Sequence, residues 1–230
     1  IVLSSLKFQE KSLIVKCFTL SHGLKSYFVR DAFSSRKANQ KIAYFQPLTI
    51  LEIEAVHKNK GTLENFKEIK IATPFHSIHS DIYKSTMAMF ISEMLHHSIH
   101  EEETNEHLFT FLETALHWLD NHDEIANFHL ILMMEMTKFL GFYPDVSEID
   151  FDFFDVKEGF FTPFQSVNTL SAHETQLFKR LIELKFDSNQ KTFAGLERQI
   201  LLKILLDFYT LHLEGFKKPK SLEVLKEVFS

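Results

Sequence analysis

The pattern of hydrophobic and polar positions changes its period near Pro74. Before it, the apolar residues gather in short runs rich in Val, Ile, Phe and Thr, which favour strands. Polar or glycine-containing breaks separate these runs. We therefore predict five strands, at residues 1–5, 13–18, 24–30, 48–56 and 65–71. Five short strands in one open sheet would leave exposed edges, so a small closed barrel is the expected solution.

After Pro74 the apolar positions recur with the 3.6-residue period of helices. The predicted helices are residues 79–100, 105–120, 126–140, 172–184, 196–213 and 221–229. The 126–140 helix is apolar for most of its length, which is typical of the centre of a bundle. The fold class is therefore α+β and multidomain: a five-stranded β-barrel over residues 1–73, then an all-α helical bundle over 74–230. Residues 146–170 form an irregular insert, rich in Asp and Phe.

Charge divides the chain at the same place. Residues 1–73 carry 12 Lys or Arg against 6 acids, a net charge of +6. The whole chain has 25 basic and 31 acidic residues, which leaves 13 and 25 for residues 74–230, a net charge of −12. A basic module followed by an acidic one indicates a part that binds polyanions, carried on a body with another task.

The strongest positive signal is the loop at residues 33–41. It carries three cations, Arg36, Lys37 and Lys41, and four aromatic residues flank it: Tyr27, Phe28, Tyr44 and Phe45. Barrels that bind nucleic acid use this combination, since cations follow the backbone and aromatic rings accept stacked bases. The alternative is that Phe28 and Phe45 belong to the core and that the loop is merely solvated.

Signatures of catalysis are missing. The sequence contains no GxSxG, GxxxxGK[ST] or GxGxxG motif, so we expect a protein that is not an enzyme. Cys17 is the single cysteine and Leu13–Phe18 is strand-like, so we expect a buried apolar side chain there. With no long apolar run and no signal peptide, we expect a cytoplasmic protein without a membrane segment.

The thirteen histidines raise the question of a metal site. His96 and His100 share a face if both lie on one helix, and two imidazoles at that spacing can chelate zinc. A good zinc site needs a third or fourth ligand, and the sequence offers no HExxH motif. We therefore expect neither a metal nor a cofactor, while a weak histidine-based site stays open.

Several short motifs, read in order, resemble one known family. They are Ile1-Val2-Leu3, Phe8-Gln9-Glu10-Lys11-Ser12, the 15–19 strand, Gly23, Ser35-Arg36-Lys37, Phe45-Gln46-Pro47-Leu48, Leu140-Gly141-Phe142-Tyr143-Pro144-Asp145, Tyr209-Thr210-Leu211-His212-Leu213-Glu214-Gly215 and Lys220-Ser221-Leu222. Together they cover the chain and resemble the bacterial recombination mediators of the RecO family.

The resemblance implies an OB-fold barrel followed by a helical domain. It also implies a recombinational repair protein that binds single- and double-stranded DNA, anneals strands and acts at the nucleoid. Its implied protein partners are RecR, with which it helps to load RecA, and the C-terminal tail of single-stranded-DNA-binding protein (SSB). By similarity, the DNA-binding candidates are the cations of the barrel: Lys7, Lys11, Lys25, Arg30, Arg36, Lys37 and Lys41.

One departure concerns the insert at residues 146–170. Many family members carry a four-cysteine zinc module there, whereas this insert has no cysteine. We expect its phenylalanines to pack the module in place of the metal.

An acidic, Phe-ending SSB tail would need an apolar slot and a cation for its carboxylate. Arg198 and Lys203 lie beside the aliphatic residues of the 196–213 helix and are the first candidates, with Lys179 and Arg180 as the second pair. The alternative is that Arg198 and Lys203 pair with surface acids. Two other functions also stay open: a generic OB-fold module that binds single strands or RNA, and a helical adaptor without a role in repair.

Overall fold

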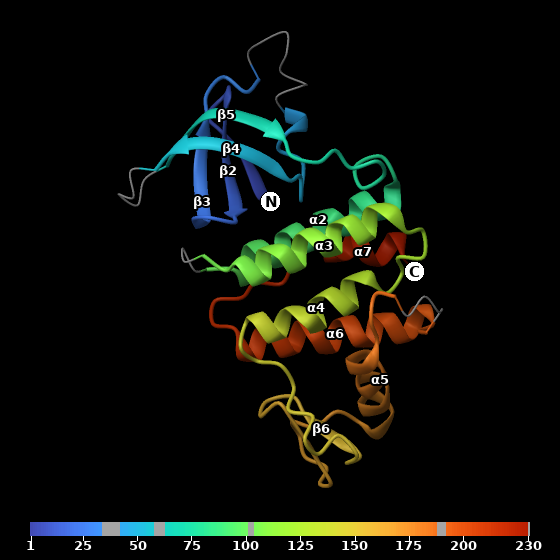
Figure 1. Ribbon diagram of the computed structural model, residues 1–230. Coiled ribbons are helices and arrows are strands. Elements are labelled where there is room, and N and C mark those ends of the chain that lie inside the picture. The colour runs from blue at the N-terminus through green and yellow to red at the C-terminus, as the bar shows by residue number, and fades with distance from the viewer. Residues whose placement is uncertain (34–41, 58–62, 101–103, 188–191, 230) are drawn as a thin grey trace. The chain divides into compact units, whose positions relative to one another are not determined.

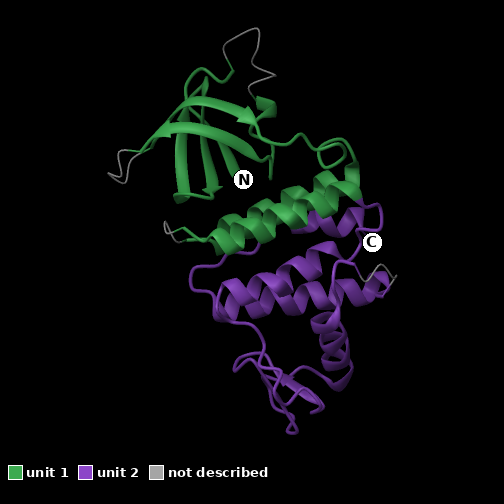
Figure 2. Ribbon diagram, in the orientation of Figure 1, with its two compact units in different colours: residues 1–121, 219–221 green, residues 122–218, 222–230 purple. Residues whose placement is uncertain are grey.

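The computed structural model describes residues 1–33, 42–57, 63–100, 104–187 and 192–229 (Figure 1). The chain divides into two compact units, coloured separately in Figure 2. Unit 1 comprises Ile1–Asn121 with Pro219–Ser221, and unit 2 comprises His122–Lys218 with Leu222–Ser230. These units are defined by compactness, and the proposed domain boundary at residue 73 stays a prediction.

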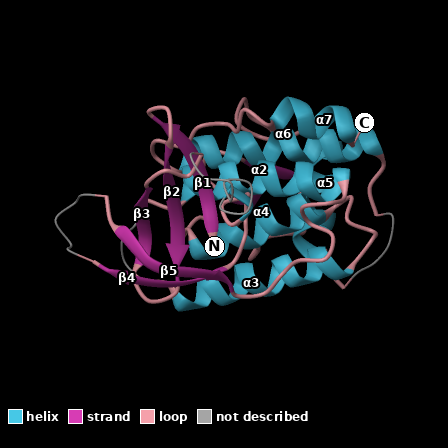
Figure 3. Ribbon diagram, turned by 90° about the horizontal axis from the view of Figure 1, so that it is seen from above, coloured by secondary structure: helices cyan, strands magenta, loops and turns pink. Residues whose placement is uncertain are grey.

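The five strands of unit 1 lie close to their predicted positions. In sheet A, β1 (Val2–Phe8), β2 (Ser12–Thr19) and β3 (Gly23–Val29) pair antiparallel in that order. In a second sheet, β4 (Leu51–Val56) pairs antiparallel with β5 (Asn65–Ile71). Figure 3 shows these strands gathered together in unit 1. The described strands thus pair as a three-stranded and a two-stranded sheet.

Strand β4 begins three residues later than predicted, and its backbone explains why. Leu48 has a φ of 64°, a left-handed conformation that no strand accommodates. Residues 48–50 are buried, and from Leu51 onward half-buried apolar residues alternate with exposed residues such as Glu52 and Glu54. The segment is thus buried at its start and partly solvated along the strand.

Both sheets contribute to one hydrophobic core. Val15, Cys17 and Tyr27 of sheet A are buried in it, and β4 and β5 pack Ile53 and Phe66 against it. The predicted burial of Cys17 is confirmed, and burial raises the pKa of its thiol to about 11. A protonated, buried thiol is a packing residue rather than a nucleophile.

Backbone hydrogen bonds also join the sheets beyond their ladders. The Val2 amide donates to the Thr49 carbonyl (3.0 Å), and the Leu48 amide donates to the Val2 carbonyl (2.8 Å), so β1 meets the segment before β4. The Phe28 amide donates to the Glu64 carbonyl (2.8 Å), so β3 meets the residue before β5.

Unit 1 continues with α2 (Ile82–Ser98) and α3 (Glu106–Asn121). The Asp81 side chain caps α2 by accepting the Lys84 amide at 2.9 Å. Phe18 of β2 packs against Phe109 of α3, with ring centroids 6.0 Å apart. Helix α3 therefore reaches the end of β2, and α2 packs against β1.

A buried carboxylate fixes the segment between β5 and α2. Asp120, near the end of α3, accepts the backbone amides of His76, Ser77 and Ile78 at 2.8, 2.8 and 3.1 Å. Burial alone would raise the pKa of this carboxyl, but the amide hydrogen bonds outweigh it and lower the pKa below its ordinary value. The buried Lys84 ammonium donates to the Asp120 carbonyl at 2.9 Å.

Unit 2 contains the remaining helices near their predicted positions: α4 (Phe128–Phe139), α5 (Ala172–Glu183), α6 (Gly195–His212) and α7 (Leu222–Val228). Helix α4 is buried on nearly every side and packs against α5 and α6, so its predicted central position in the helical part is confirmed.

The insert at residues 146–170 contains a hairpin, which corrects the expectation of an all-α region after residue 73. Its strands are β6 (Phe153–Asp155) and β7 (Phe160–Thr162). Gly159 between them has a φ of 77°. The 3.6-residue period is absent from the insert, and strands of three residues are too short to show a period of two.

Two phenylalanines of this hairpin enter the core of unit 2. Phe154 and Phe161 are buried with their ring centroids 4.9 Å apart. Phe154 also packs against Phe178 of α5 (4.6 Å) and Phe208 of α6 (5.8 Å). Phe164, in contrast, is 77% exposed. The expected packing role of the phenylalanines therefore holds for part of the insert.

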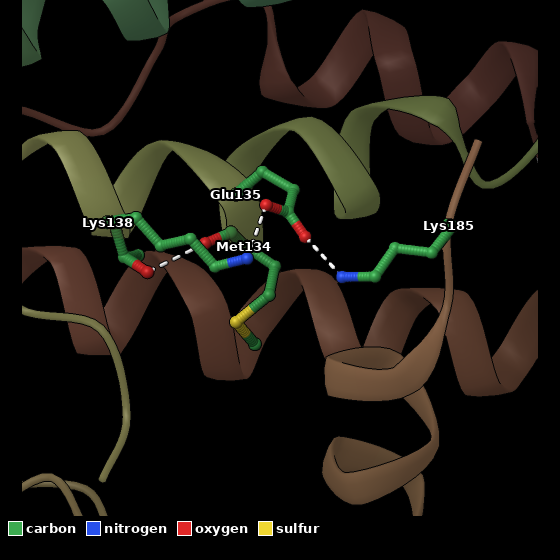
Figure 4. Close-up of polar contacts among 5 residues, drawn as sticks. Met134, Glu135, Lys138 and Lys185 are labelled. Atoms are coloured by element: carbon green, nitrogen blue, oxygen red, sulfur yellow. Dashed lines mark hydrogen bonds and ion pairs between the residues drawn. The ribbon is translucent and has the colours of Figure 1, made fainter. Parts of the chain in front are cut away.

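A bridging carboxylate ties α4 to the segment after α5 (Figure 4). Glu135 accepts hydrogen bonds from Lys138 at 2.6 Å and from Lys185 at 2.7 Å. Burial would raise the pKa of the Glu135 carboxyl, but the two ammonium groups lower it below its ordinary value.

Candidate nucleic-acid interface

Four of the seven predicted DNA-binding cations lie on or beside sheet A. Lys7 is near the end of β1, Lys11 in the turn that follows, Lys25 on β3, and Arg30 directly after β3. Lys7, Lys11 and Arg30 are exposed and Lys25 is half-buried. The β2 residues opposite Lys7 and Lys25 are four positions apart, about 13 Å along the strand. Those two β2 residues, Leu13 and Cys17, are core residues, so Lys7 and Lys25 belong to the core side of sheet A, while Lys11 and Arg30 lie in its turns.

The other three predicted cations, Arg36, Lys37 and Lys41, lie outside the described residues. The loop that gave the strongest sequence signal thus stays a prediction.

Two of the aromatic residues proposed to accept bases are core residues. Tyr27 is 1% and Phe45 3% exposed, because both rings stack on Phe66 in the core of unit 1. The Tyr27 hydroxyl is 2.9 Å from Nε2 of His57, and burial raises the pKa of this phenol. Their assignment as base-stacking residues is therefore wrong, while Phe28 stays half-exposed on sheet A.

The structure reveals exposed apolar residues that the sequence prediction missed. Leu6 and Phe8 on β1 are 62% and 40% exposed. The predicted strand ended at Ser5, which left both residues in a turn. Their spacing of two, with Lys7 between them, is the signal that could have placed both on one face of the strand.

The histidine pair proposed as a weak metal site does not share a helix. Helix α2 ends at Ser98, and Ile99 adopts an extended conformation (φ −95°, ψ 108°), so His100 lies beyond the helix. Within the part of the chain that the structure describes, no three His, Cys, Asp or Glu side chains gather into a group that could hold a metal ion. His96 and His100 would share a face only if α2 continued for two more residues, to His100.

For the proposed partner peptide, the structure places Arg198 of α6 in a pocket of unit 2. Leu202, Leu225 and Phe229 form apolar parts of its wall, and Lys226 adds a second cation. The Arg198 guanidinium donates from Nη1 to the Phe193 carbonyl at 2.7 Å. Its buried Nε has no hydrogen-bond acceptor among the described residues. The pocket thus combines apolar surface with cations.

The remaining peptide candidates lie elsewhere in unit 2. Lys203 is exposed on α6 and is not part of the pocket wall. Lys179 lies over the Phe161 ring at 5.5 Å. Arg180 lies over Phe193 at 4.8 Å and pairs with Glu197 at 3.3 Å. Arg180 is therefore already engaged by an acid of α6.

Comparison with known proteins gives matches along almost the whole chain. Residues 1–75 match the family model described as Recombination protein O N terminal, and residues 79–223 match Recombination protein O C terminal. The chain belongs to the RecO family. Among the helices described for this RecO-family chain, none combines the length and apolar character needed to cross a membrane.

Relatives at high identity agree with this assignment. The DNA repair protein RecO of Flavobacterium psychrophilum is 75% identical, and that of Flavobacterium johnsoniae 74%. The DNA repair protein RecO of Christiangramia forsetii is 42% identical. Each alignment covers 100% of this chain and 97% of the relative. This RecO-family chain is therefore a DNA repair and recombination protein.

Proposed function

We propose that this protein is a non-enzymatic recombination mediator that binds single- and double-stranded DNA through the basic surface of unit 1. It anneals complementary strands at the nucleoid and, together with RecR, helps to load RecA onto SSB-coated DNA. The observation that carries the proposal is the set of cations spread along sheet A, in a chain that belongs to a family of DNA repair proteins.

The DNA-binding part is proposed to be a five-stranded OB-fold barrel over residues 1–73, followed by a helical domain over 74–230. The shared core supports this, as do the hydrogen bonds that link β1 to the segment before β4 and β3 to the residue before β5. With these two links, the strands would follow one another around a closed barrel in the order β1, β2, β3, β5, β4 and back to β1. The gap between the two family matches, at residues 76–78, lies close to this division and supports it.

A salt titration tests the DNA-binding proposal. If Lys and Arg side chains contact phosphates, log affinity falls linearly with log salt, and each lost contact lowers the slope by about 0.7 for single strands. We propose that Lys7, Lys11, Lys25, Arg30, Arg36, Lys37 and Lys41 make such contacts. Changing Arg36, Lys37 and Lys41 together to Glu should weaken binding and flatten the slope. A variant with the wild-type slope and affinity would place the contacts elsewhere.

We further propose that unit 2 binds the SSB tail, with Arg198 as the main cation for its terminal carboxylate. The apolar wall of the pocket beside Arg198 supports α6 as the helix that binds the tail. The Nε atom of Arg198, which has no acceptor among the described residues, is a further hydrogen-bond donor. Lys203, Lys179 and Arg180 are proposed as secondary contacts. An Arg donor and a carboxylate form a charge-assisted hydrogen bond, which is stronger than a neutral one.

A labelled acidic peptide ending in Phe tests this second proposal. Arg198→Glu should lose more affinity than Lys203→Glu, a matched change on the same helix but outside the pocket wall. Arg198→Lys, which keeps the charge, should retain part of the binding. Equal affinity for all variants would remove α6 from the site, and no binding to wild-type protein would remove this partner.

A further inference from the structure

The outer face of sheet A carries two neighbouring rows of side chains that leave apolar surface in solvent. The register aligns Leu6 with Ile14 and Ile14 with Phe28, which makes one row across the three strands. In the next row Phe8 lies opposite Ser12. The rings of Phe8 and Phe28 meet edge to face, with centroids 6.0 Å apart. This contact confirms that both aromatic side chains share one face.

The described residues of unit 1 cover part of this face. At the far end of β2, Phe18 packs against α3, and Lys16 is half-buried. At the near end, Leu6 is mostly exposed and Phe8 has two fifths of its surface in solvent. Phe28 is half-exposed beside it.

The charges around the exposed end favour an anionic partner. Arg30 is exposed in the turn that directly follows β3, two residues after Phe28. Lys16, two residues after Ile14, lies on the other side of the apolar row. Lys11 lies in the turn after Phe8. The acids of the two turns are Glu10 and Asp31, so the cations are in excess.

We propose that Leu6, Phe8 and Phe28 form a platform on which unpaired nucleobases of single-stranded nucleic acid stack, while Arg30 and Lys16 contact the phosphates on either side. The proposal rests on the proposed DNA-binding function and assigns its base-contacting residues. Stacking on aromatic rings is independent of sequence because every base has a flat π-face. A duplex keeps its bases stacked inside, so the platform contributes to single-strand binding and not to duplex binding.

The test uses the full-length protein and two labelled probes, an oligo(dT) strand and a duplex of equal length. Phe8→Ala should weaken binding of the single strand about 5- to 150-fold, the range for loss of one stacked base. Duplex affinity and the salt slope should stay unchanged. Phe8→Leu keeps the apolar packing but lacks the π-face, so it should show most of the loss in affinity. Phe8→Trp keeps a π-face, so it should bind the single strand about as well as wild type, and oligo(dT) should quench the fluorescence of the introduced tryptophan.

The control is Phe164→Ala, which removes an exposed phenylalanine of the insert in unit 2 and should change neither affinity. If wild-type protein binds neither probe, the proposed function itself fails. If it binds DNA but Phe8→Ala and Phe8→Leu leave the preference for single strands unchanged, the platform is wrong. Sedimentation without DNA gives a further check. If the wild-type protein is a dimer and Phe8→Ala is a monomer, a second copy of the chain covers this face, and the platform proposal is also wrong.

Discussion

Two regions of the molecule, the outer face of sheet A in unit 1 and the interior beneath the insert in unit 2, use phenylalanine in opposite ways. In unit 1, Phe8 and Phe28 meet on the outer face of sheet A, partly in solvent and close to cations. In unit 2, Phe154 and Phe161 lie in an interior formed by the insert, α5 and α6, where they contact other aromatic rings. The insert rings fill a core, whereas the sheet rings are available to a partner.

The difference shows that composition alone does not assign a role to an aromatic residue. The same side chain stabilises the interior beneath the insert through burial, at roughly 25 cal/mol per Å² of apolar surface, and leaves surface for recognition on the outer face of sheet A. Exposure and neighbouring charge separate the two uses. Substitutions in the two regions should therefore have separable effects on folding and on DNA binding.

The largest effect is expected in the core of unit 2. Phe154→Ala should lower the free energy of unfolding by about 3–5 kcal/mol, because it removes a fully buried ring and leaves a cavity. Urea unfolding followed by circular dichroism measures this change. The matched Phe164→Ala should stay within about 0.5 kcal/mol of wild type. An equal loss for both would refute the contrast between buried and exposed rings of the insert.

The second largest effect is expected in unit 1, where the buried Asp120 carboxylate holds the segment between β5 and α2. Asp120→Ala should cost about 2–4 kcal/mol, because it leaves three backbone amides without their acceptor. Asp120→Asn keeps one acceptor oxygen and should cost less. Thermal unfolding checks the order, and a melting temperature unchanged in Asp120→Ala would contradict the anchoring role.

The smallest effect concerns pH and the buried imidazole of unit 2. Burial, and then the charge of Arg198, lower the pKa of His129 to about 3. Below the ordinary histidine pKa of about 6.5 the unfolded chain takes up a proton that the folded chain does not. Stability should therefore fall as pH drops from about 6.5 towards 3, by at most about 1.4 kcal/mol per pH unit for this group.

His129→Leu should flatten that dependence, which urea unfolding at pH 7.5, 6.5 and 5.5 measures. The difference between the two proteins at pH 7.5 reports the packing change alone, since the imidazole is neutral in both states there. An identical loss of stability on acidification in both proteins would contradict the assignment to His129.

Strands and helices were predictable because burial repeats along them. The apolar runs of β2 and β3 and the periodic faces of α3 and α6 gave their positions to within a few residues. Errors occurred where one backbone conformation decides the outcome. The left-handed Leu48 delays β4, and the extended Ile99 ends α2 before His100.

The candidate sites were less predictable, because exposure depends on contacts between segments distant in sequence. Nothing near Tyr27 in the sequence shows that Phe66 stacks on it at 4.2 Å, and so its burial could not be foreseen. The exposure of Leu6 and Phe8 likewise depends on which part of sheet A α3 covers. The pocket at Arg198 needs Leu225 and Phe229, which come from a different helix and the segment after it.

Photocrosslinking tests the central contrast most directly. Single-stranded DNA carrying 5-iododeoxyuridine would be irradiated on the full-length protein, and the crosslinked tryptic peptides identified by mass spectrometry. The account predicts crosslinks in the peptides of residues 8–11 and 26–30, which contain Phe8 and Phe28. Crosslinks confined to the peptide of residues 158–179, which holds the exposed rings of the insert, would contradict it.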